Sequence, residues 1–387
     1  MNTPVQEELP IAQVTGSAPV LAILTVDDAD GDFRGNRSNF ADLIRTGEQM
    51  GFIVYVLTVK HLSLTRKKLK GYVYDRESAS WQARLMPFPT VIYNRIPQRE
   101  DEMLPAVRSK IKACRKHPRV KLFNPAFFNK WHLFMWLRRS RTTKPFIPAT
   151  RRLMNADGLE RMISRHGYLY LKPESGKAGK GIMTIKHLEE RPLPYRLRIQ
   201  EDKKSATYRC SSIQKLWSRI QKQSGGEAYI AQQGIRLAAF QDRRFDLRAL
   251  VQKNRSGTWE LTGLGARIAG ASSITTHVPR GGRIEDPEKL LTCTFSREQA
   301  HRLLLKAKMA ALLIAKQIER ASGYRLGEMS MDLGVDRQGN LWFFEANSKP
   351  MKFDEPHIRQ KSLERIFQYG AYLAGRPAKR TRRTRRA

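Results

Sequence analysis

Continuous apolar runs and one helical stripe alternate at the start of the chain. Residues 20–26 (VLAILTV) and 52–59 (FIVYVLTV) are uninterrupted apolar segments, which are typical of buried parallel strands. Between them, apolar side chains recur at helical spacing, at Phe40, Leu43, Ile44, Gly47 and Met50. Strand, helix and strand in this order predict a βαβ unit, so the chain opens as an α/β domain.

Shorter elements follow this unit. Pro87, Pro89 and Pro97 interrupt short strands, and helical character is expected over residues 102–117 and 129–139. Polar residues stand at the predicted strand ends, where α/β domains bind ligands, although ordinary loop polarity explains them as well: Asp27, Asp28, Asn94 and Arg95.

The middle of the chain predicts a strand over residues 167–171, a basic loop and a second strand over 182–185. The segment 191–226 is polar and basic, and we interpret it as a surface elaboration with a helix near 212–223. Residues 228–235 (AYIAQQGI) read as a strand that runs into a connector.

The last third alternates strands and helices. Two neighbouring antiparallel strands are expected over 245–252 and 258–269, with Asp246 and Arg248 on one face of the first. A helix over 297–322 carries a core stripe and is expected to end at a Gly323 cap; the stripe is Leu303, Ala307, Ala311, Ile314 and Ile318. A helix over 357–373 follows, and then an Arg-rich tail that we expect to be disordered.

The segment 330–350 (SMDLGVDRQGNLWFFEANSKP) predicts a hairpin with its turn at residues 336–340. Asp332, Glu345 and Asn347 could converge at one end of it, and oxygen ligands of this kind suit Mg²⁺. Turn chemistry alone is the alternative. Against it, Glu345 and Asn347 follow an apolar run instead of lying in the turn, and a carboxylate at the end of a buried strand needs a partner.

A glycine-punctuated basic loop follows Lys172 and contains Gly176, Gly179 and Gly181. Glycine lets backbone N–H groups approach a phosphate, and Lys172 with the loop lysines Lys177 and Lys180 supplies countercharge. The GxxxxGK[ST] spacing of a Walker loop is absent. A phosphate site and a simple hairpin loop are both open at this point.

The charge of the chain is strongly positive. It holds 71 Lys and Arg against 36 Asp and Glu, a net charge of +35, and only seven of the basic residues lie after Gly375. The excess is therefore spread over the folded body, which indicates a solvated basic surface, attraction to polyanions or an acidic substrate. No zinc-finger spacing, basic zipper or aromatic RNA-binding motif accompanies it.

Other global features point to a cytoplasmic protein without a transmembrane segment. The apolar runs are too short to span a bilayer, and the N-terminus has no signal-peptide pattern. Cys114, Cys210 and Cys293 are scattered without the spacing of a disulfide framework or a zinc site. The oligomeric state is left open by the sequence.

Several separated motifs agree in order and spacing with one family. FRGNRSNFADL, FPTVIYNRIPQRE, YIAQQGI and FEANSKP resemble the YheC/YheD family of spore-coat-associated ATP-grasp proteins, over residues 20–375. The resemblance implies an α/β protein that is α+β in its ATP-grasp core, with a Rossmann-like pre-ATP-grasp domain followed by the two-lobed ATP-grasp fold. Its expected divisions are a lead-in (1–18), a pre-ATP-grasp domain (19–125), a small lobe with a basic insertion (126–228), a large lobe (229–375) and the tail (376–387).

The resemblance also assigns roles to individual residues. Lys130 and Lys172 match the two lysines that bind nucleotide phosphates, under a lid formed by the loop of Gly176, Gly179 and Gly181. Gln232 and Gln233 form the polar connector, and Gln233 and Ile235 match the residues that face adenine, although many ATP-grasp enzymes have an acid in place of Gln233. Asp246 matches a ribose contact. Asp332, Glu345 and Asn347 match ligands for two Mg²⁺ ions, with Glu345 as the bridge.

A ligase reaction is the implied chemistry. ATP would phosphorylate a carboxylate, and an amine or a thiol would attack the acylphosphate. Arg248, Arg267 and Arg280 would stabilise the transferred phosphate. His277 stands where related ligases often have Asn. Two other functions are kept open: a structural spore-coat protein that retains the nucleotide site, and a protein that binds nucleic acid or another polyanion through its basic surface and tail.

Overall fold

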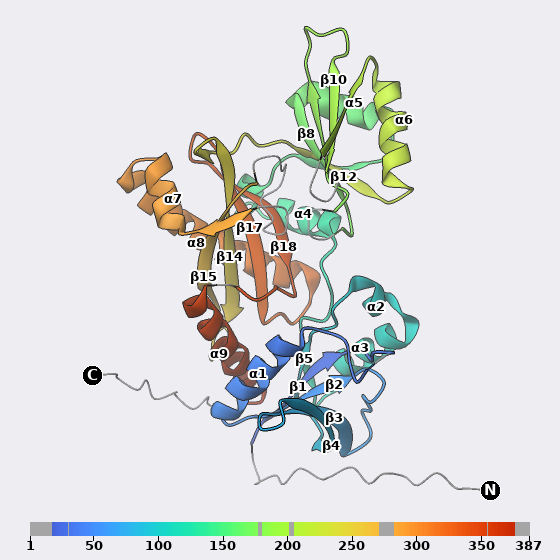
Figure 1. The fold of residues 1–387 in the computed structure, drawn as a ribbon, viewed down its shortest axis with the longest axis vertical. Coiled ribbons are helices and arrows are strands. Elements are labelled where there is room, and N and C mark those ends of the chain that lie inside the picture. Colours follow the sequence, from blue (N-terminus) through green and yellow to red (C-terminus); the bar gives the residue numbers. More distant parts are fainter. Residues whose placement is uncertain are drawn as a thin grey trace, which may run out of the picture.

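The computed structural model describes residues 18–29, 31–176, 180–200, 205–270, 282–353 and 355–375. Three sheets follow one another along the chain. Along the long axis of the molecule, the third sheet lies between the first and the second (Figure 1). None of the helices in this part of the chain is long and apolar enough to cross a membrane.

The first sheet has the strand order β4-β3-β2-β1-β5-β6. Its central strands are parallel, and the β3–β4 hairpin extends it in antiparallel fashion. The strands are β1 (Val20–Thr25), β2 (Ile53–Thr58), β3 (Lys68–Asp75), β4 (Ser80–Pro87), β5 (Val91–Asn94) and β6 (Lys121–Phe123). The predicted βαβ unit is confirmed, with helix α1 (Arg37–Gln49) between β1 and β2.

The helix expected over residues 102–117 is two helices, α2 (Arg99–Met103) and α3 (Pro105–Lys116). Leu104 between them has φ −58° and ψ 132°, outside the helical region. The proline ring at position 105 clashes with a helical residue before it, which explains the break. The expected helical character is therefore present, with a break at Leu104.

The second sheet is antiparallel, with the order β11-β10-β9-β8-β12-β7. Its strands are β7 (Thr150–Leu153), β8 (Tyr168–Pro173), β9 (Met183–His187), β10 (Tyr195–Gln200), β11 (Ser205–Cys210) and β12 (Tyr229–Gln233). Helices α5 (Ala156–His166) and α6 (Ile213–Ser224) pack on one face. The helix predicted near 212–223 is α6. The segment 191–226 also supplies two strands of this sheet, β10 and β11, so its interpretation as a surface elaboration was wrong.

The third sheet has the order β16-β15-β14-β17-β18, and β13 pairs with β14. Its strands are β13 (Ala239–Phe240), β14 (Arg243–Lys253), β15 (Trp259–Ile268), β16 (Arg283–Glu285), β17 (Glu328–Val335) and β18 (Leu341–Asn347). Helices α4 (Lys130–Arg138), α7 (Pro287–Thr294) and α8 (Arg297–Ser322) share its core, and the short 3₁₀ helix η1 (Lys144–Phe146) lies after α4. The stripe predicted on α8 is buried, and Gly323 ends that helix with a left-handed φ of 64°.

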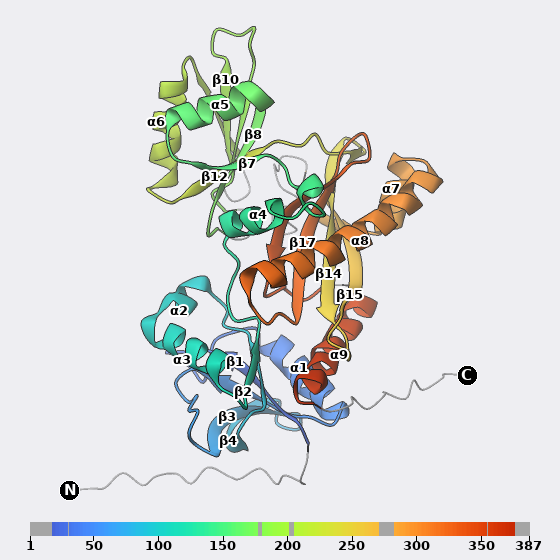
Figure 2. The ribbon, with the colours of Figure 1, turned by 180° about the vertical axis from the view of Figure 1, so that it is seen from behind.

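Helix α9 (Pro356–Leu373) lies between the first and third sheets, as the view from behind also shows (Figure 2). Its Ile366, Phe367 and Tyr369 belong to the core of the first sheet, while Ile358 packs against Leu250 of β14. The end of the chain therefore ties the third sheet back to the first.

Asn124, which follows β6, makes a second tie between these two sheets. Its side chain is fully buried, donates from Nδ2 to the carbonyls of Glu328 and Ser348, and accepts from the Gly327 N–H at 2.7 Å. Its φ is +54°, a left-handed value that Asn tolerates better than most residues.

Asn124→Ala is expected to lower the free energy of unfolding by about 2 kcal/mol or more, because three backbone groups lose their partner and at least one stays buried. Asn124→Gly removes the same hydrogen bonds without the strain of a Cβ at positive φ, so it should cost roughly 1 kcal/mol less. Urea denaturation of both variants measures the two effects. Unchanged stability in both would contradict the assigned role.

Candidate nucleotide and metal site

The expected hairpin is formed by β17 and β18, and its turn is closed by Asp336. The carboxylate of Asp336 accepts from the backbone N–H groups of Gln338 and Asn340 and from the Trp342 ring at 2.8 Å. Turn chemistry therefore occupies Asp336, whereas the three predicted metal ligands lie at the other end of the strands.

Asp332 and Glu345 face each other across this hairpin, and Asn347 pairs with Ser330 in the same register. A bulge follows directly, since Leu333 pairs with Phe343 and leaves Phe344 without an opposite residue. The bulge lets Phe343 enter the core while Glu345 remains opposite Asp332. Like charges directly opposite each other are destabilising, so this pair requires cations.

Arginines from the neighbouring strands supply positive charge beside Asp332. Arg267 Nη2 lies 2.9 Å from Asp332 Oδ2, and Arg248 Nη1 lies 3.4 Å from Asp332 Oδ1. Arg267 also holds both carboxylate oxygens of Asp246 at 3.0 Å. Burial lowers the pKa of Arg267, but Asp332 and Asp246 outweigh this effect and the pKa is raised. The side chain is therefore a fixed cation between two acids.

Lys130 supplies the countercharge at Glu345. It stands at the start of α4, where Asn129 caps the helix by accepting from the His132 N–H. Its ammonium lies 3.2 Å from Glu345 Oε1 and donates to the Gly176 carbonyl. The lysine thus joins the β17–β18 hairpin to Gly176, the first glycine of the loop.

Lys172 projects from β8 into the region that holds Lys130 and Glu345. Its Nζ donates to Gln232 Oε1 at 2.7 Å and lies 5.4 Å from the Phe344 ring centroid. Burial is the main reason that its pKa falls to about 8; Glu345 opposes the fall and Lys130 adds to it. The site therefore holds a cation that is poorly solvated and is suited to an anionic ligand.

The glycine loop is described at both ends. Gly181 has φ +72°, and a Cβ there would lie 2.8 Å from the Tyr229 hydroxyl, so only glycine fits. Gly176 lies beside Lys130. Gly179 lies outside the described residues, as do Lys177, His277 and Arg280. Their predicted roles stay predictions.

Glu174, which sequence reasoning missed, fixes the start of this loop. Arg152 donates to both of its oxygens, at 2.7 and 3.0 Å, and the Lys130 N–H donates to its carbonyl at 3.0 Å. An acid two residues after a predicted phosphate lysine, at the end of a buried strand, was the available signal, because such an acid needs a partner.

The two glutamines predicted as a polar connector are the last residues of β12. Gln232 is buried and orients Lys172, while its own Nε2 donates to Thr150 Oγ1 at 3.0 Å. Gln233 accepts from the Ala149 N–H through Oε1 at 3.2 Å, and Ile235 is buried. The adenine contacts predicted for Gln233 and Ile235 and the ribose contact predicted for Asp246 are not tested by these interactions.

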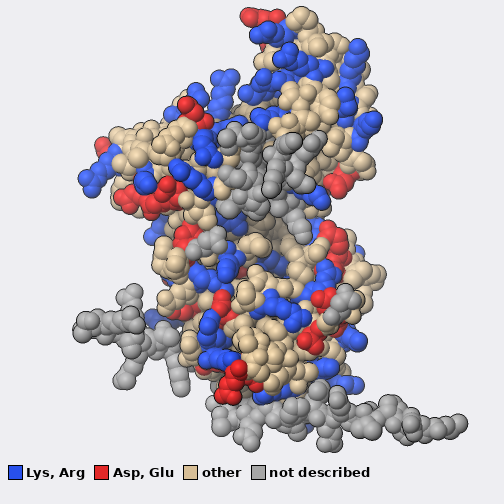
Figure 3. Space-filling model, viewed as in Figure 1, with Lys and Arg blue, Asp and Glu red and all other residues tan. Residues whose placement is uncertain are grey.

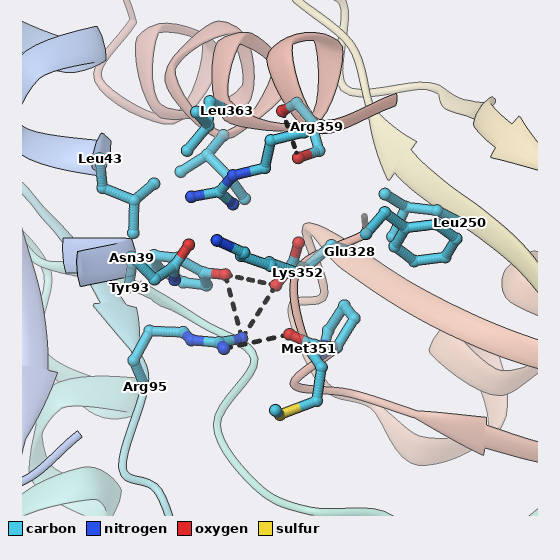
Figure 4. Close-up of a pocket in the computed structure, with 14 residues that line it drawn as sticks. Asn39, Leu43, Tyr93, Arg95, Leu250, Glu328, Met351, Lys352, Arg359 and Leu363 are labelled. Carbon is cyan, nitrogen blue, oxygen red and sulfur yellow. Dashed lines mark hydrogen bonds and ion pairs between the residues drawn. The ribbon is translucent and has the colours of Figure 1, made fainter. Parts of the chain in front are cut away.

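The polar residues at the end of β5 serve the junction between the first and third sheets. Arg95 Nη1 lies 3.3 Å from Glu328 Oε1, and the Tyr93 hydroxyl donates to the same oxygen (Figure 4). Lys349 follows the β17–β18 hairpin, and its ammonium donates to Asn94 Oδ1 and to Glu102 Oε1. Burial lowers the pKa of Lys349 to about 8, against the effect of Glu102. Arg95 and Asn94 therefore position the hairpin.

A cavity of about 30 Å³ lies at this junction, with Asn39 and Arg359 at its edge (Figure 4). Among the described residues, Asn39 Oδ1 and Arg359 Nε are buried without a hydrogen-bond partner. The volume suits one or two water molecules, which would satisfy these atoms, and is too small for a substrate.

Divalent metal binding fits the donor set of the hairpin. In the described part of the chain, no group of three or more His, Cys, Asp and Glu could hold a metal ion. Mg²⁺ does not require one, since one or two carboxylates with water and phosphate oxygens complete its shell. Asp332 and Glu345 provide two carboxylates opposite each other, and Asn347 an amide oxygen on the same strand as Glu345.

Comparison with known proteins agrees with this arrangement. The family described as "YheC/D like ATP-grasp" matches residues 119–373. The chain belongs to this YheC/D-like ATP-grasp family. The predicted family and fold class are therefore confirmed.

Two curated proteins of Bacillus subtilis (strain 168) are similar to the chain. Endospore coat-associated protein YheD is 27% identical, with 92% of this chain and 79% of the relative covered. Endospore coat-associated protein YheC is 21% identical, with 84% and 88% covered.

Solved structures share the ATP-grasp fold at low sequence identity. D-alanyl-alanine synthetase A from Vibrio cholerae gives a TM-score of 0.54 at 12% identity, covering 92% of this chain and 99% of the other. ATP-grasp ligase PsnB, complexed with a minimal precursor, gives 0.51 at 14% identity, covering 91% and 100%.

Proposed function

We propose that the protein is a Mg-ATP-dependent ligase that activates a carboxylate as an acylphosphate and joins it to an amine or a thiol. One observation carries the proposal: Lys130 and Lys172, from different parts of the chain, meet an opposed pair of carboxylates on the metal hairpin. Membership in the ATP-grasp family and the names of the similarly folded ligases support it.

The reaction balances as a group transfer in two steps. A carboxylate oxygen attacks the γ-phosphorus, the bond between that phosphorus and the β–γ bridging oxygen breaks, and ADP leaves. An amine or a thiol then attacks the carbonyl carbon of the acylphosphate, loses its proton and expels phosphate. No oxidant or reductant is required, and the protein acts by alignment and charge stabilisation.

Each described side chain has a part in this scheme. Lys130 and Lys172 hold the phosphates, and the ends of the glycine loop at Gly176 and Gly181 bring backbone close to them. Asp332, Glu345 and Asn347 would hold Mg²⁺, which would supply positive charge for the phosphates. Arg248 and Arg267 place positive charge beside the transferred phosphate.

The test has two stages. Isothermal titration first measures binding of ATP in the presence of Mg²⁺; phosphate release from ATP is then followed across a panel of carboxylates, each with and without amines or thiols. We expect ATP binding and phosphate release that depends on one carboxylate. Absence of ATP binding to the wild-type chain would overturn the proposal.

A structural role at the spore coat is the second candidate, because both curated relatives are named as endospore coat-associated. In this case nucleotide would bind and stabilise the fold without turnover. A protein whose Tm rises with Mg-ATP, but which releases no phosphate with any member of the panel, would favour this candidate. The opposed acids favour the enzyme, since like charges directly opposite each other in a sheet weaken a structural protein.

Lys172→Met should weaken ATP binding by roughly 10- to 100-fold, because a hydrogen bond to a charged group contributes about 1.5–3 kcal/mol. With a pKa of about 8, the wild-type ammonium is charged below pH 8 and loses its proton above it. Affinity of the wild type should therefore fall between pH 7 and 9.5, while the variant shows a flatter dependence. Titrations at several pH values measure both.

The matched control is Lys215→Met, which removes an exposed lysine of α6 from the far face of the second sheet. It should leave both the affinity and its pH dependence unchanged. Equal losses in the two variants would show that net charge, not Lys172, determines binding.

A further inference from the structure

The face of the second sheet that α5 and α6 leave open forms a groove of about 220 Å³. It begins beside the connector at Tyr168, whose carbonyl accepts from the Gly234 N–H, and reaches the edge strand β11. Five cations line it, namely Lys186, Arg196, Arg198, Arg209 and Arg244, and no Asp or Glu is among its lining residues.

The strand register places three of these cations in one line. Tyr168 pairs with Lys186, Lys186 with Arg196, and Arg196 with Arg209. With strands about 4.8 Å apart, the line from β8 to β11 is roughly 14 Å long. It therefore runs across the strands, away from Lys172, and is longer than a single phosphate or carboxylate.

The cations repel one another within the groove. The pKa of Lys186 is lowered, first by burial and then by Arg196 and Arg244. Like charges opposite each other in a sheet cost stability, and an anion in the groove would offset that cost. On the face seen in Figure 3, the uppermost lobe shows many Lys and Arg side chains and few acidic ones.

We infer that this groove docks an acidic stretch of a polypeptide, which is the carboxylate substrate or carries it to the nucleotide site. The inference rests on the proposed ligase function, which requires a carboxylate, and it adds the class of molecule that brings one. Extended acidic peptide is complementary in sign to the line of cations and long enough to follow it.

Two features favour peptide over single-stranded nucleic acid. Sites for single-stranded nucleic acid combine positive charge with aromatic side chains on which bases stack. Along this face β9, β10 and β11 contribute Thr, Lys and Arg, and the aromatic Tyr168 has Lys186 5.0 Å from its ring centroid. In addition, β11 ends the strand order, so a peptide that crosses the groove and turns at this edge can pair with the outer backbone groups of β11.

Fluorescence anisotropy with a fluorescein-labelled peptide rich in Glu and Asp tests the inference on the full chain. The groove variant is Arg196→Ser/Arg209→Ser. The control is Arg161→Ser/Lys222→Ser, which removes two exposed cations from the helical face of the same lobe. We expect the Kd to rise at least about tenfold in the groove variant and to stay unchanged in the control. Affinity should fall steeply with salt.

Equal weakening in both variants would overturn the inference, because it would show attraction to net charge alone. It would also be overturned if a single-stranded RNA of the same charge bound more tightly than the peptide and lost affinity in the groove variant. Mg-ATP titration of the same proteins separates the two proposals: the groove variant should bind ATP like the wild type. Failure of the wild type to bind ATP would reject the proposed function instead.

Discussion

Glu345→Gln is expected to lower the rate of ATP-dependent phosphate release by about 100- to 1,000-fold. The carboxylate lies opposite Asp332 and 3.2 Å from Lys130, at the proposed metal and phosphate position. An amide of the same size keeps the packing but removes the charge, and loss of one preorganised electrostatic group costs this much in catalysis. Phosphate release measured with the best carboxylate of the panel, at saturating Mg²⁺, gives the ratio.

Glu298→Gln on α8 is the matched control, since the side chain of that glutamate is 79% exposed and pairs with Arg302 one helical turn away. It should release phosphate at the wild-type rate. A Glu345→Gln variant that retained its activity would remove the acid from the reaction. Thermal unfolding of both variants shows whether a loss of activity is a loss of fold.

Local patterns in the sequence predicted the elements that carry the chemistry. The alternation around Asp246 and Arg248 and the apolar run before Glu345 depend on neighbours a few residues apart, so period and turn signals reveal them. In the structure, Arg267 pairs with Asp246, Arg248 lies beside Asp332, and Lys130 pairs with Glu345. The family resemblance supplied the pairing of Lys130 with Lys172, which no local pattern contains.

Contacts between distant parts of the chain could not be predicted in this way. Arg95 with Glu328, Lys349 with Glu102, and Asn124 with Gly327 join residues about 200 or more positions apart. Hydrophobic periodicity describes one element at a time and says nothing about which elements meet. Similarly, the basic segment 191–226 hid two strands, because their outward positions are occupied by arginines that face the groove.

The bulge in the hairpin is a further example. Sequence spacing places Glu345 and Asn347 on one face of β18, but alternation alone does not indicate that Phe344 is an inserted residue. The same limit applies to Gln232 and Gln233, which differ by one position. Gln232 faces Lys172 and Gln233 the backbone of Ala149, and only the register of β12 against β8 and β7 decides this.

Arg267→Met is expected to be strongly destabilising, by about 3–5 kcal/mol, which corresponds to a fall in Tm of roughly 5 °C for a chain of this length. Arg267 is 6% exposed, and its guanidinium pairs with Asp246 at 3.0 Å and with Asp332 at 2.9 Å. Methionine fills similar volume but leaves two buried carboxylates without this partner. Differential scanning calorimetry at neutral pH measures the change.

Two further variants test whether the loss of stability in Arg267→Met comes from removing the cation between two carboxylates. Arg302→Met breaks an ion pair between exposed side chains of α8 and should cost less than about 1 kcal/mol. Adding Asp246→Asn to Arg267→Met neutralises one of the two carboxylates that lose Arg267, so it should recover part of the lost stability. A double variant less stable than Arg267→Met would contradict this explanation. Since Arg267 also contacts Asp332, recovered stability without recovered phosphate release would separate its role in the fold from its role beside the metal hairpin.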